Sequence, residues 1–235
     1  DQAAAAFAFG DLRDDRACLN VGTGAFLQRA IAADAQAVDG LLKSVLYSDA
    51  AGAVCSLEGT VNGAASALAW LQTRVALDLE RAIHALPARA PRQTLLFING
   101  VGGLGAPWWR PAFPVEFVGQ GEELAQLIAV IESIVFLVCV NLEAMQSAGP
   151  LAAIAITGGL ARSDYLCQSL ADLGGLTVER AALREATARG TAYLAAGRPA
   201  SWPAVPLERS FEPDVNRTLE ARYRHWREEM SRRGA

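Results

Sequence analysis

Residues 156–173 read ITGGLARSDYLCQSLADL. An apolar run over residues 151–156 leads into Gly158-Gly159, and an amphipathic run over residues 163–173 follows the two glycines. This order predicts a buried strand, a tight turn and a helix, which is the repeating unit of an α/β sheet. Turn amides left unpaired between a strand and a helix form a site for a phosphate group. Gly158 and Gly159 are therefore candidate nucleotide-binding residues.

A second glycine turn, Gly22-Thr23-Gly24, lies within residues 16–28, where apolar and polar side chains alternate. The alternation predicts a β-hairpin with the glycines at its tip, and Thr23 adds a hydroxyl that can contact a phosphate oxygen. Taken singly, a hairpin tip or a helix entry explains each turn without a ligand. Neither turn matches the lysine-bearing phosphate loop or the dinucleotide fingerprint with three spaced glycines. A nucleotide site built from this pair would therefore belong to a different fold.

The rest of the chain supplies further strands and helices. Strands are predicted over residues 44–47, 54–58, 94–98 and 177–180, and helices over residues 63–73, 75–86, 122–146, 185–196 and 216–233. Asn62 is predicted to cap the helix over residues 63–73, Asp1-Gln2 to end a strand, and residues 197–213 to form a proline-punctuated linker. Strands first, followed by alternating helices and strands, predict one α/β domain with a mixed sheet flanked by helices.

The composition is that of a globular protein with a modest negative charge. Of 235 residues, 52% are apolar, and 21 Lys and Arg against 25 Asp and Glu give a net charge of -4. The charges are scattered, which argues against nucleic acid or an anionic membrane as a partner. The most apolar window, residues 127–140, is shorter than a bilayer requires and contains Glu132 and Ser133, so it predicts a buried core helix. No export signal is present, and a cytoplasmic location is predicted.

Cysteines and histidines form no metal-binding pattern. The four cysteines lie far apart, only two histidines accompany them, and no residue of the chain is assigned to a metal. Both histidines, His84 and His225, lie on polar helix faces and are predicted to be solvated. Buried free thiols are predicted for Cys18, Cys55, Cys139 and Cys167.

Six motifs occur in order along the chain. They are DQAA (residues 1–4), NVGTGAF (20–26), SLEGTVNGAASALAWL (56–71), GLGAPWW (103–109), ITGGLARSDYLCQSLADL (156–173) and REATARGTAYLA (184–195). In this order they resemble the C-terminal domain of the FGGY carbohydrate kinases, and the glycerol kinases are the most similar branch. The resemblance covers nearly the whole chain. It implies a ribonuclease-H-like domain of the actin and sugar kinase superfamily, with residues 1–235 as the C-terminal nucleotide-binding domain and the N-terminal substrate domain outside this chain.

The resemblance also implies a reaction, which is ATP-dependent phosphorylation of a polyol or sugar hydroxyl with ATP and Mg²⁺ as cofactors. Asp1 corresponds to the catalytic base that takes the proton from the attacking hydroxyl. Asp1, Gln2 and Phe26 correspond to substrate contacts. The positions that correspond to nucleotide contacts are Gly22, Thr23, Gly24, Gly63, Gly158, Gly159 and Ser163. The implied partners are a small polyol or sugar, ATP, the N-terminal domain of the same polypeptide and a second copy in a homo-oligomer.

The sequence departs from the glycerol kinase pattern at several positions. Ser163 stands where those enzymes carry asparagine, and Ala67 stands where they carry glutamine, so two side-chain amides are replaced. Two alternatives therefore stay open. One is a pentulose or other sugar kinase of the same family, and the other is a non-catalytic nucleotide-binding module of the actin-like fold. With only one wall of the cleft, the chain alone is expected to be inactive as a kinase.

Three further side chains have structural predictions. Trp108 and Trp109 follow a proline turn and are expected to seal an edge of the core. Glu132 lies in the most apolar helix and needs a polar partner, and it is expected to brace the loop over residues 103–107.

Overall fold

The computed structural model describes residues 2–50, 52–89, 94–183 and 185–235, and its centre is a seven-stranded sheet. The strand order is β3-β4-β2-β1-β7-β8-β9. β1, β7 and β8 run parallel, and the other neighbours in the sheet pair antiparallel. The bounds are β1 Arg16–Val21, β2 Ala25–Ile31, β3 Leu42–Asp49, β4 Gly52–Val61, β7 Ala153–Thr157, β8 Thr177–Ala181 and β9 Leu207–Phe211. A mixed α/β sheet, as the sequence predicts, is therefore confirmed.

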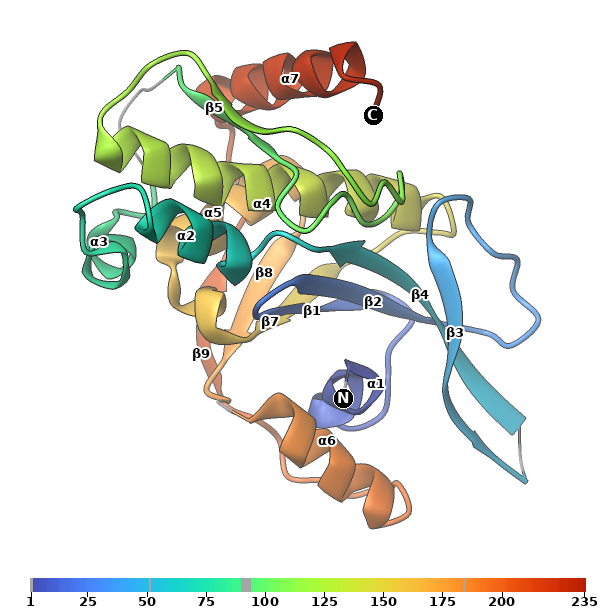
Figure 1. The fold of residues 1–235 in the computed structure, drawn as a ribbon. Helices are drawn as coiled ribbons and strands as arrows, with labels where there is room; N and C mark the ends of the chain where they lie inside the picture. The colour runs from blue at the N-terminus through green and yellow to red at the C-terminus, as the bar shows by residue number, and fades with distance from the viewer. Residues whose placement is uncertain (1, 51, 90–93, 184) are drawn as a thin grey trace.

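Helices cover both faces of this sheet (Figure 1). On one face lie α2, α4, α5 and α7, and on the other lie α1 and α6. The bounds are α1 Gln2–Ala6, α2 Ala65–Gln72, α3 Leu79–Ala85, α4 Glu123–Gln146, α5 Asp164–Gly174, α6 Ala186–Ala195 and α7 Arg217–Arg232. Two short 3-10 helices are η1 Phe7–Phe9 and η2 Gly159–Arg162, and a separate two-stranded sheet pairs β5 Leu96–Asn99 with β6 Val115–Val118.

α4 forms the centre of the hydrophobic core. Its residues from Leu127 to Leu142 are all buried, and the inward side chains of β1, Ala17, Leu19 and Val21, belong to the same core. Within the described parts of the chain, α4 is also the one helix long and apolar enough to cross a bilayer, and 78% of its apolar window is buried inside the fold. The predicted core helix is therefore confirmed.

α1 and α6 pack closely on the opposite face. A Cβ atom on Gly190 of α6 would lie 1.7 Å from the carbonyl oxygen of Ala4, so only glycine permits this approach. The rings of Phe7 and Tyr193 stack beside the contact, with centroids 6.3 Å apart. The strand end predicted at Asp1-Gln2 is wrong for Gln2, which begins a helix, because the alanine run that follows favours helical backbone. Asp1 lies outside the described residues.

A buried ion pair fastens the C-terminal helix to the core. Glu132 of α4 is 1% exposed and accepts hydrogen bonds from Tyr165 of α5 and from Arg222 of α7. Burial lowers the pKa of the Arg222 guanidinium, but the bond and charge of Glu132 outweigh it, and the pKa is raised. Glu132 was expected to brace the loop over residues 103–107, whereas the hydrogen bonds described here join it to α5 and α7.

The GLGAPWW loop is held by other groups. The Asn62 amide donates to the carbonyl oxygens of Gly102 and Gly103, at 2.9 and 3.2 Å. Trp108 packs edge-on against Trp226 of α7, which confirms the predicted packing role for this residue. The same prediction is wrong for Trp109, which is 44% exposed and whose indole N–H donates to the Gly40 carbonyl at 2.7 Å. Asn62 is therefore not the cap of α2, whose N-cap position is Ala64, without a capping side chain.

Three other segments differ from prediction. The helix expected over residues 75–86 is shorter, since Asp78 caps it and accepts from the Arg81 amide at 3.0 Å. Strand β9 lies inside the predicted linker, where pairing with β8 supplies the hydrogen bonds that local sequence does not signal. Strand β6 was not predicted either and forms by pairing with β5.

Candidate functional site

Both glycine turns lie at one edge of the central sheet. β1 and β7 are parallel neighbours, so their last residues, Val21 and Thr157, end side by side. Gly158 has φ +96°, and a Cβ atom there would lie 2.4 Å from the Val21 carbonyl oxygen. A Cβ atom on Gly159 would meet no atom within 4 Å. Gly158 is thus required by the fold, whereas Gly159 faces open space.

The hairpin tip is bonded to the start of α2. The amides of Ala64 and Ser66 donate to the Thr23 carbonyl at 3.3 and 3.1 Å, and the Ala65 amide donates to the Gly22 carbonyl at 3.0 Å. These bonds satisfy the first amides of α2 and fix the tip against it. In the described chain the amides of Thr23 and Gly24 donate to no other protein group. They are therefore available to an anion at the tip.

Two of the predicted nucleotide contacts have structural roles in this fold. The Ser163 side chain is 1% exposed and caps α5 by accepting from the Leu166 amide at 3.3 Å. A Cβ atom on Gly63 would lie 2.3 Å from the Asn99 side-chain oxygen, and the Gly63 carbonyl accepts from the Asn99 amide at 2.8 Å. These bonds join protein groups to one another, so the nucleotide contacts of Ser163 and Gly63 stay predictions.

Two adjoining cavities flank η2. The first, of about 400 Å³, has apolar walls from α2, α3 and η2, and its apolar lining consists of Leu68, Ala69, Leu79, Ile83 and Leu160. The second, of about 660 Å³, is more polar and includes Thr157, Gly158, Arg180, Glu185 and Glu208. Both cavities are also lined by His84, Gly159 and Arg162. An apolar cavity beside a polar one suits a ligand that has a flat apolar part and a polar end.

His84, Arg162 and the apolar wall were not predicted as site residues. They come from α2, α3 and η2, which are separated by many residues in the chain. Arg162, Leu68, Ala69 and Leu160 lie within two of the quoted motifs, but the motifs do not indicate which of their residues line a cavity, since that depends on how these elements are packed together. The prediction that His84 is exposed is confirmed, although its exposed ring also lines both cavities.

Arg180 fixes the position of the turn at Gly158-Gly159. Its Nη1 donates to the Ala161 carbonyl at 3.1 Å and to the Asp164 carboxylate at 2.8 Å, so β8 holds both η2 and the start of α5. Burial lowers the pKa of this guanidinium, but the bond to Asp164 and nearby charges outweigh it, and the pKa is raised. The group is therefore a permanent cation at the rear of the larger cavity.

Phe26 of β2 lies on the sheet face that α1 and α6 cover, opposite Asn20 and Thr60 in the strand register. The backbone of Gln2 begins α1 on the same face, while Asp1 is outside the described residues. The structure thus places the predicted substrate contact Phe26 next to the hairpin tip, because Gly24 is two residues away. The substrate-binding roles of Asp1, Gln2 and Phe26 remain predictions.

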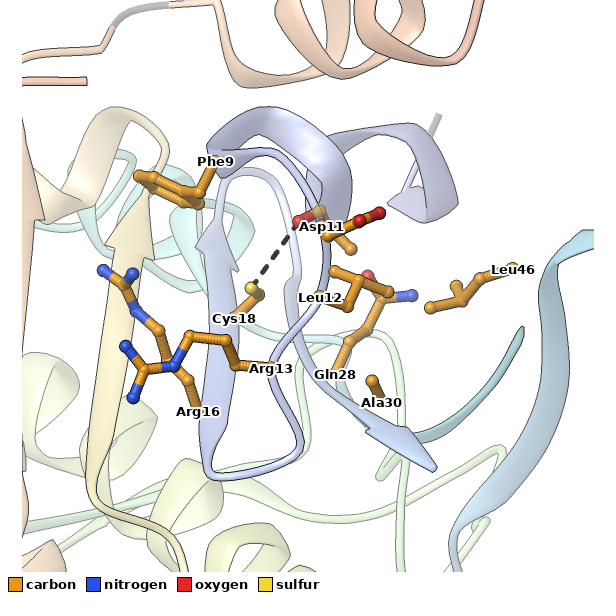
Figure 2. Close-up of a pocket in the computed structure, with 10 residues that line it drawn as sticks. Phe9, Asp11, Leu12, Arg13, Arg16, Cys18, Gln28, Ala30 and Leu46 are labelled. Carbon is orange, nitrogen blue, oxygen red and sulfur yellow. Dashed lines mark hydrogen bonds between the residues drawn. The ribbon is translucent and has the colours of Figure 1, made fainter. Parts of the chain in front are cut away.

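A smaller cavity of about 50 Å³ lies on this same face, behind β1 and β2 (Figure 2). Cys18 lines it and donates its thiol to the Ala6 carbonyl at 3.8 Å. Burial raises the pKa of the Cys18 thiol to about 11, so it stays protonated at neutral pH. The four cysteines are free thiols, as predicted; Cys55, Cys139 and Cys167 are buried, whereas the residue Cys18 is half-buried.

The described residues contain no group of three or more His, Cys, Asp or Glu side chains arranged to hold a metal ion.

The sequence profile of the FGGY family of carbohydrate kinases, C-terminal domain, matches residues 17–197. The chain belongs to this family. It is 32% identical over 247 residues to a glycerol kinase of Halothermothrix orenii, covering 98% of this chain and 50% of that protein. Like the other FGGY chains it matches, this relative is much longer. The chain spans about half the length of the curated relatives it matches.

Solved FGGY structures show the same fold. The chain superimposes on Plasmodium falciparum glycerol kinase with ADP at a TM-score of 0.83 and 21% identity, covering 100% of this chain and 50% of that one. A xylulose kinase from Rhodospirillum rubrum gives a TM-score of 0.77 at 19% identity, covering 99% and 50%. The chain thus has the actin and sugar kinase fold of the FGGY family.

Substitutions at the adjacent glycines of this FGGY domain should separate folding from ligand contact. Gly158→Ala is expected to lower the free energy of unfolding by about 2 kcal/mol or more, because it adds positive-φ strain and a clash with Val21. Gly159→Ala is expected to change it by less than about 0.5 kcal/mol and to weaken ADP binding. Urea unfolding and calorimetric titration of both variants would measure this. Equal losses of stability in the two variants would contradict a structural role for Gly158 and a ligand-facing position for Gly159.

Proposed function

We propose that this chain is the nucleotide-binding domain of an ATP-dependent kinase that phosphorylates a hydroxyl of a polyol or sugar. The observation that carries the proposal is the meeting of both glycine turns at the carboxyl ends of the neighbouring strands β1 and β7, where Gly159 lines both an apolar and a polar cavity. The FGGY family assignment supports the reaction class. The glycerol kinase relatives support a glycerol-type substrate.

In this proposal each part of the site has a distinct task. The apolar wall from α2 and α3 takes the base, and the unpaired amides of Thr23 and Gly24 bind phosphate oxygens. The turn at Gly158-Gly159 lets backbone approach the phosphates closely. ATP, bound with Mg²⁺, supplies the phosphoryl group. Asp1 accepts the proton of the attacking hydroxyl.

The proposed preference for a glycerol-type substrate rests on a small number of residues. Gln2 after Asp1, Phe26 after the glycine turn, and the GLGAPWW motif at residues 103–109 favour a glycerol-type substrate. A ring at position 26 can pack on the carbon backbone of a small polyol. A pentulose is the second candidate, since xylulose kinases have the same fold. The remaining substrate contacts and the second wall of the cleft belong, in this proposal, to an N-terminal domain outside this chain.

A coupled assay of ADP release tests the proposal. The protein that joins this chain to its N-terminal half is expected to turn over glycerol faster than pentuloses or hexuloses, and the chain alone to transfer no phosphate. Faster turnover of a pentulose would select the second candidate. ADP binding without phosphorylation of any polyol or sugar would instead identify a non-catalytic module.

A further inference from the structure

Arg162 is a charged side chain at the place where the two cavities meet. It is exposed, and its guanidinium makes no hydrogen bond or ion pair with the described residues. In the same part of the structure Arg180 and Arg209 are both bonded to Asp164. Unlike Arg180 and Arg209, Arg162 therefore stays available to a ligand, as far as the described residues go.

Arg162 and Gly159 lie close together, and both line the two cavities. The two residues are the ends of η2, a single 3-10 turn, so their backbones are roughly 6 Å apart along its axis. Both line the apolar and the polar cavity. A ligand that runs from one cavity into the other must pass both residues.

Carboxylates line both cavities near the junction, so a positive charge at Arg162 changes how an anion is received there. Glu185 and Glu208 line the polar cavity, and Glu80 lines the apolar one. The Glu208 carboxylate lies 3.1 Å from Arg180, which offsets its charge in part. An incoming anion would meet these carboxylates, and a guanidinium at the junction reduces that repulsion and offers a forked pair of donors.

We propose that Arg162 binds a phosphate group of the nucleotide and thereby discriminates a nucleotide from its nucleoside. This inference rests on the proposed function, because it assumes that the base occupies the apolar cavity. It adds a specificity-determining residue that lies outside the two glycine turns.

ADP and adenosine are the probes that test it, titrated into the chain by calorimetry. Arg162→Gln is expected to weaken ADP binding about tenfold and adenosine binding less than about twofold, because only ADP carries the anionic group. Arg162→Lys should keep part of the ADP affinity, since it restores the charge without the fork. Arg81→Gln is the matched control, because Arg81 is exposed on α3, its guanidinium bonds to none of the described residues, and it lines neither cavity.

The outcomes separate the two levels of inference. If the wild-type chain binds neither ADP nor adenosine, the proposed function fails and the role of Arg162 fails with it. If wild type binds both, but Arg162→Gln weakens both equally or behaves like Arg81→Gln, the role of Arg162 alone is overturned. Thermal unfolding of each variant confirms that folded protein was titrated. An ADP affinity of the wild-type chain that does not change with salt concentration would also overturn the role of Arg162.

Discussion

Arg222→Met is expected to lower the free energy of unfolding by about 3 kcal/mol or more, because it leaves the buried Glu132 carboxylate without its cationic partner. The side chains of Glu132 and Arg222 are only 1% and 11% exposed, so water cannot replace the lost charge. Tyr165 still donates to the carboxylate but carries no charge. Urea denaturation followed by circular dichroism measures the change.

Two companion variants show whether the ion pair is the cause. Arg224→Met removes the same charge from the exposed side of α7 and is expected to change stability by less than about 0.5 kcal/mol. Replacing both partners, Glu132→Leu with Arg222→Met, is expected to recover most of the loss, since no buried charge remains. A double variant as unstable as Arg222→Met would show that helix packing, and not the stranded charge, dominates.

Asp1→Asn is expected to lower kcat about 10²- to 10⁴-fold in the protein that contains both halves of the proposed cleft, while ADP affinity stays the same. The asparagine keeps the size of the side chain but cannot accept the proton of the attacking hydroxyl at neutral pH. Steady-state kinetics with glycerol and calorimetry with ADP measure the two quantities separately.

The control for this prediction is Asp34→Asn, which makes the same change in an exposed loop between β2 and β3. It should leave both quantities unchanged. Turnover retained by Asp1→Asn would remove Asp1 from the mechanism. A parallel loss of ADP binding would indicate that the residue maintains the site and does not act as the base.

Local sequence pattern was sufficient to predict the helices and strands whose own residues favour that structure. The hairpin around residues 22–24 follows from alternation, α5 follows from its apolar periodicity, and α4 follows from its long run of apolar residues. Their elements lie close to the predicted bounds. The pattern failed for β9 because that strand is stabilised by β8 and not by its own residues. At residues 3–6 the alanine run was a helix signal that the strand prediction overlooked.

Some residues of the candidate site could likewise be predicted from local sequence, and others could not. The glycines could be predicted because a turn restricts the residue type in the chain itself. Asn62 and Ser163 show the ambiguity of polar residues, since both stand before a helix, yet only Ser163 caps one and Asn62 bonds a loop 40 residues away. Arg162 and His84 could not be predicted, because their importance arises from two cavities that exist only after α2, α3 and η2 have packed.

The hydrogen bonds from the start of α2 to Gly22 and Thr23 have a consequence for ligand choice. They join the hairpin tip to the helix that carries Leu68 and Ala69, so both ends of the proposed site belong to one rigid unit. The entropy of ordering these segments is lost on folding and not on binding. In the proposed site, the distance between the part that takes the base and the part that takes the phosphate would then be fixed. A molecule whose base and phosphate are spaced differently would bind more weakly for that reason alone.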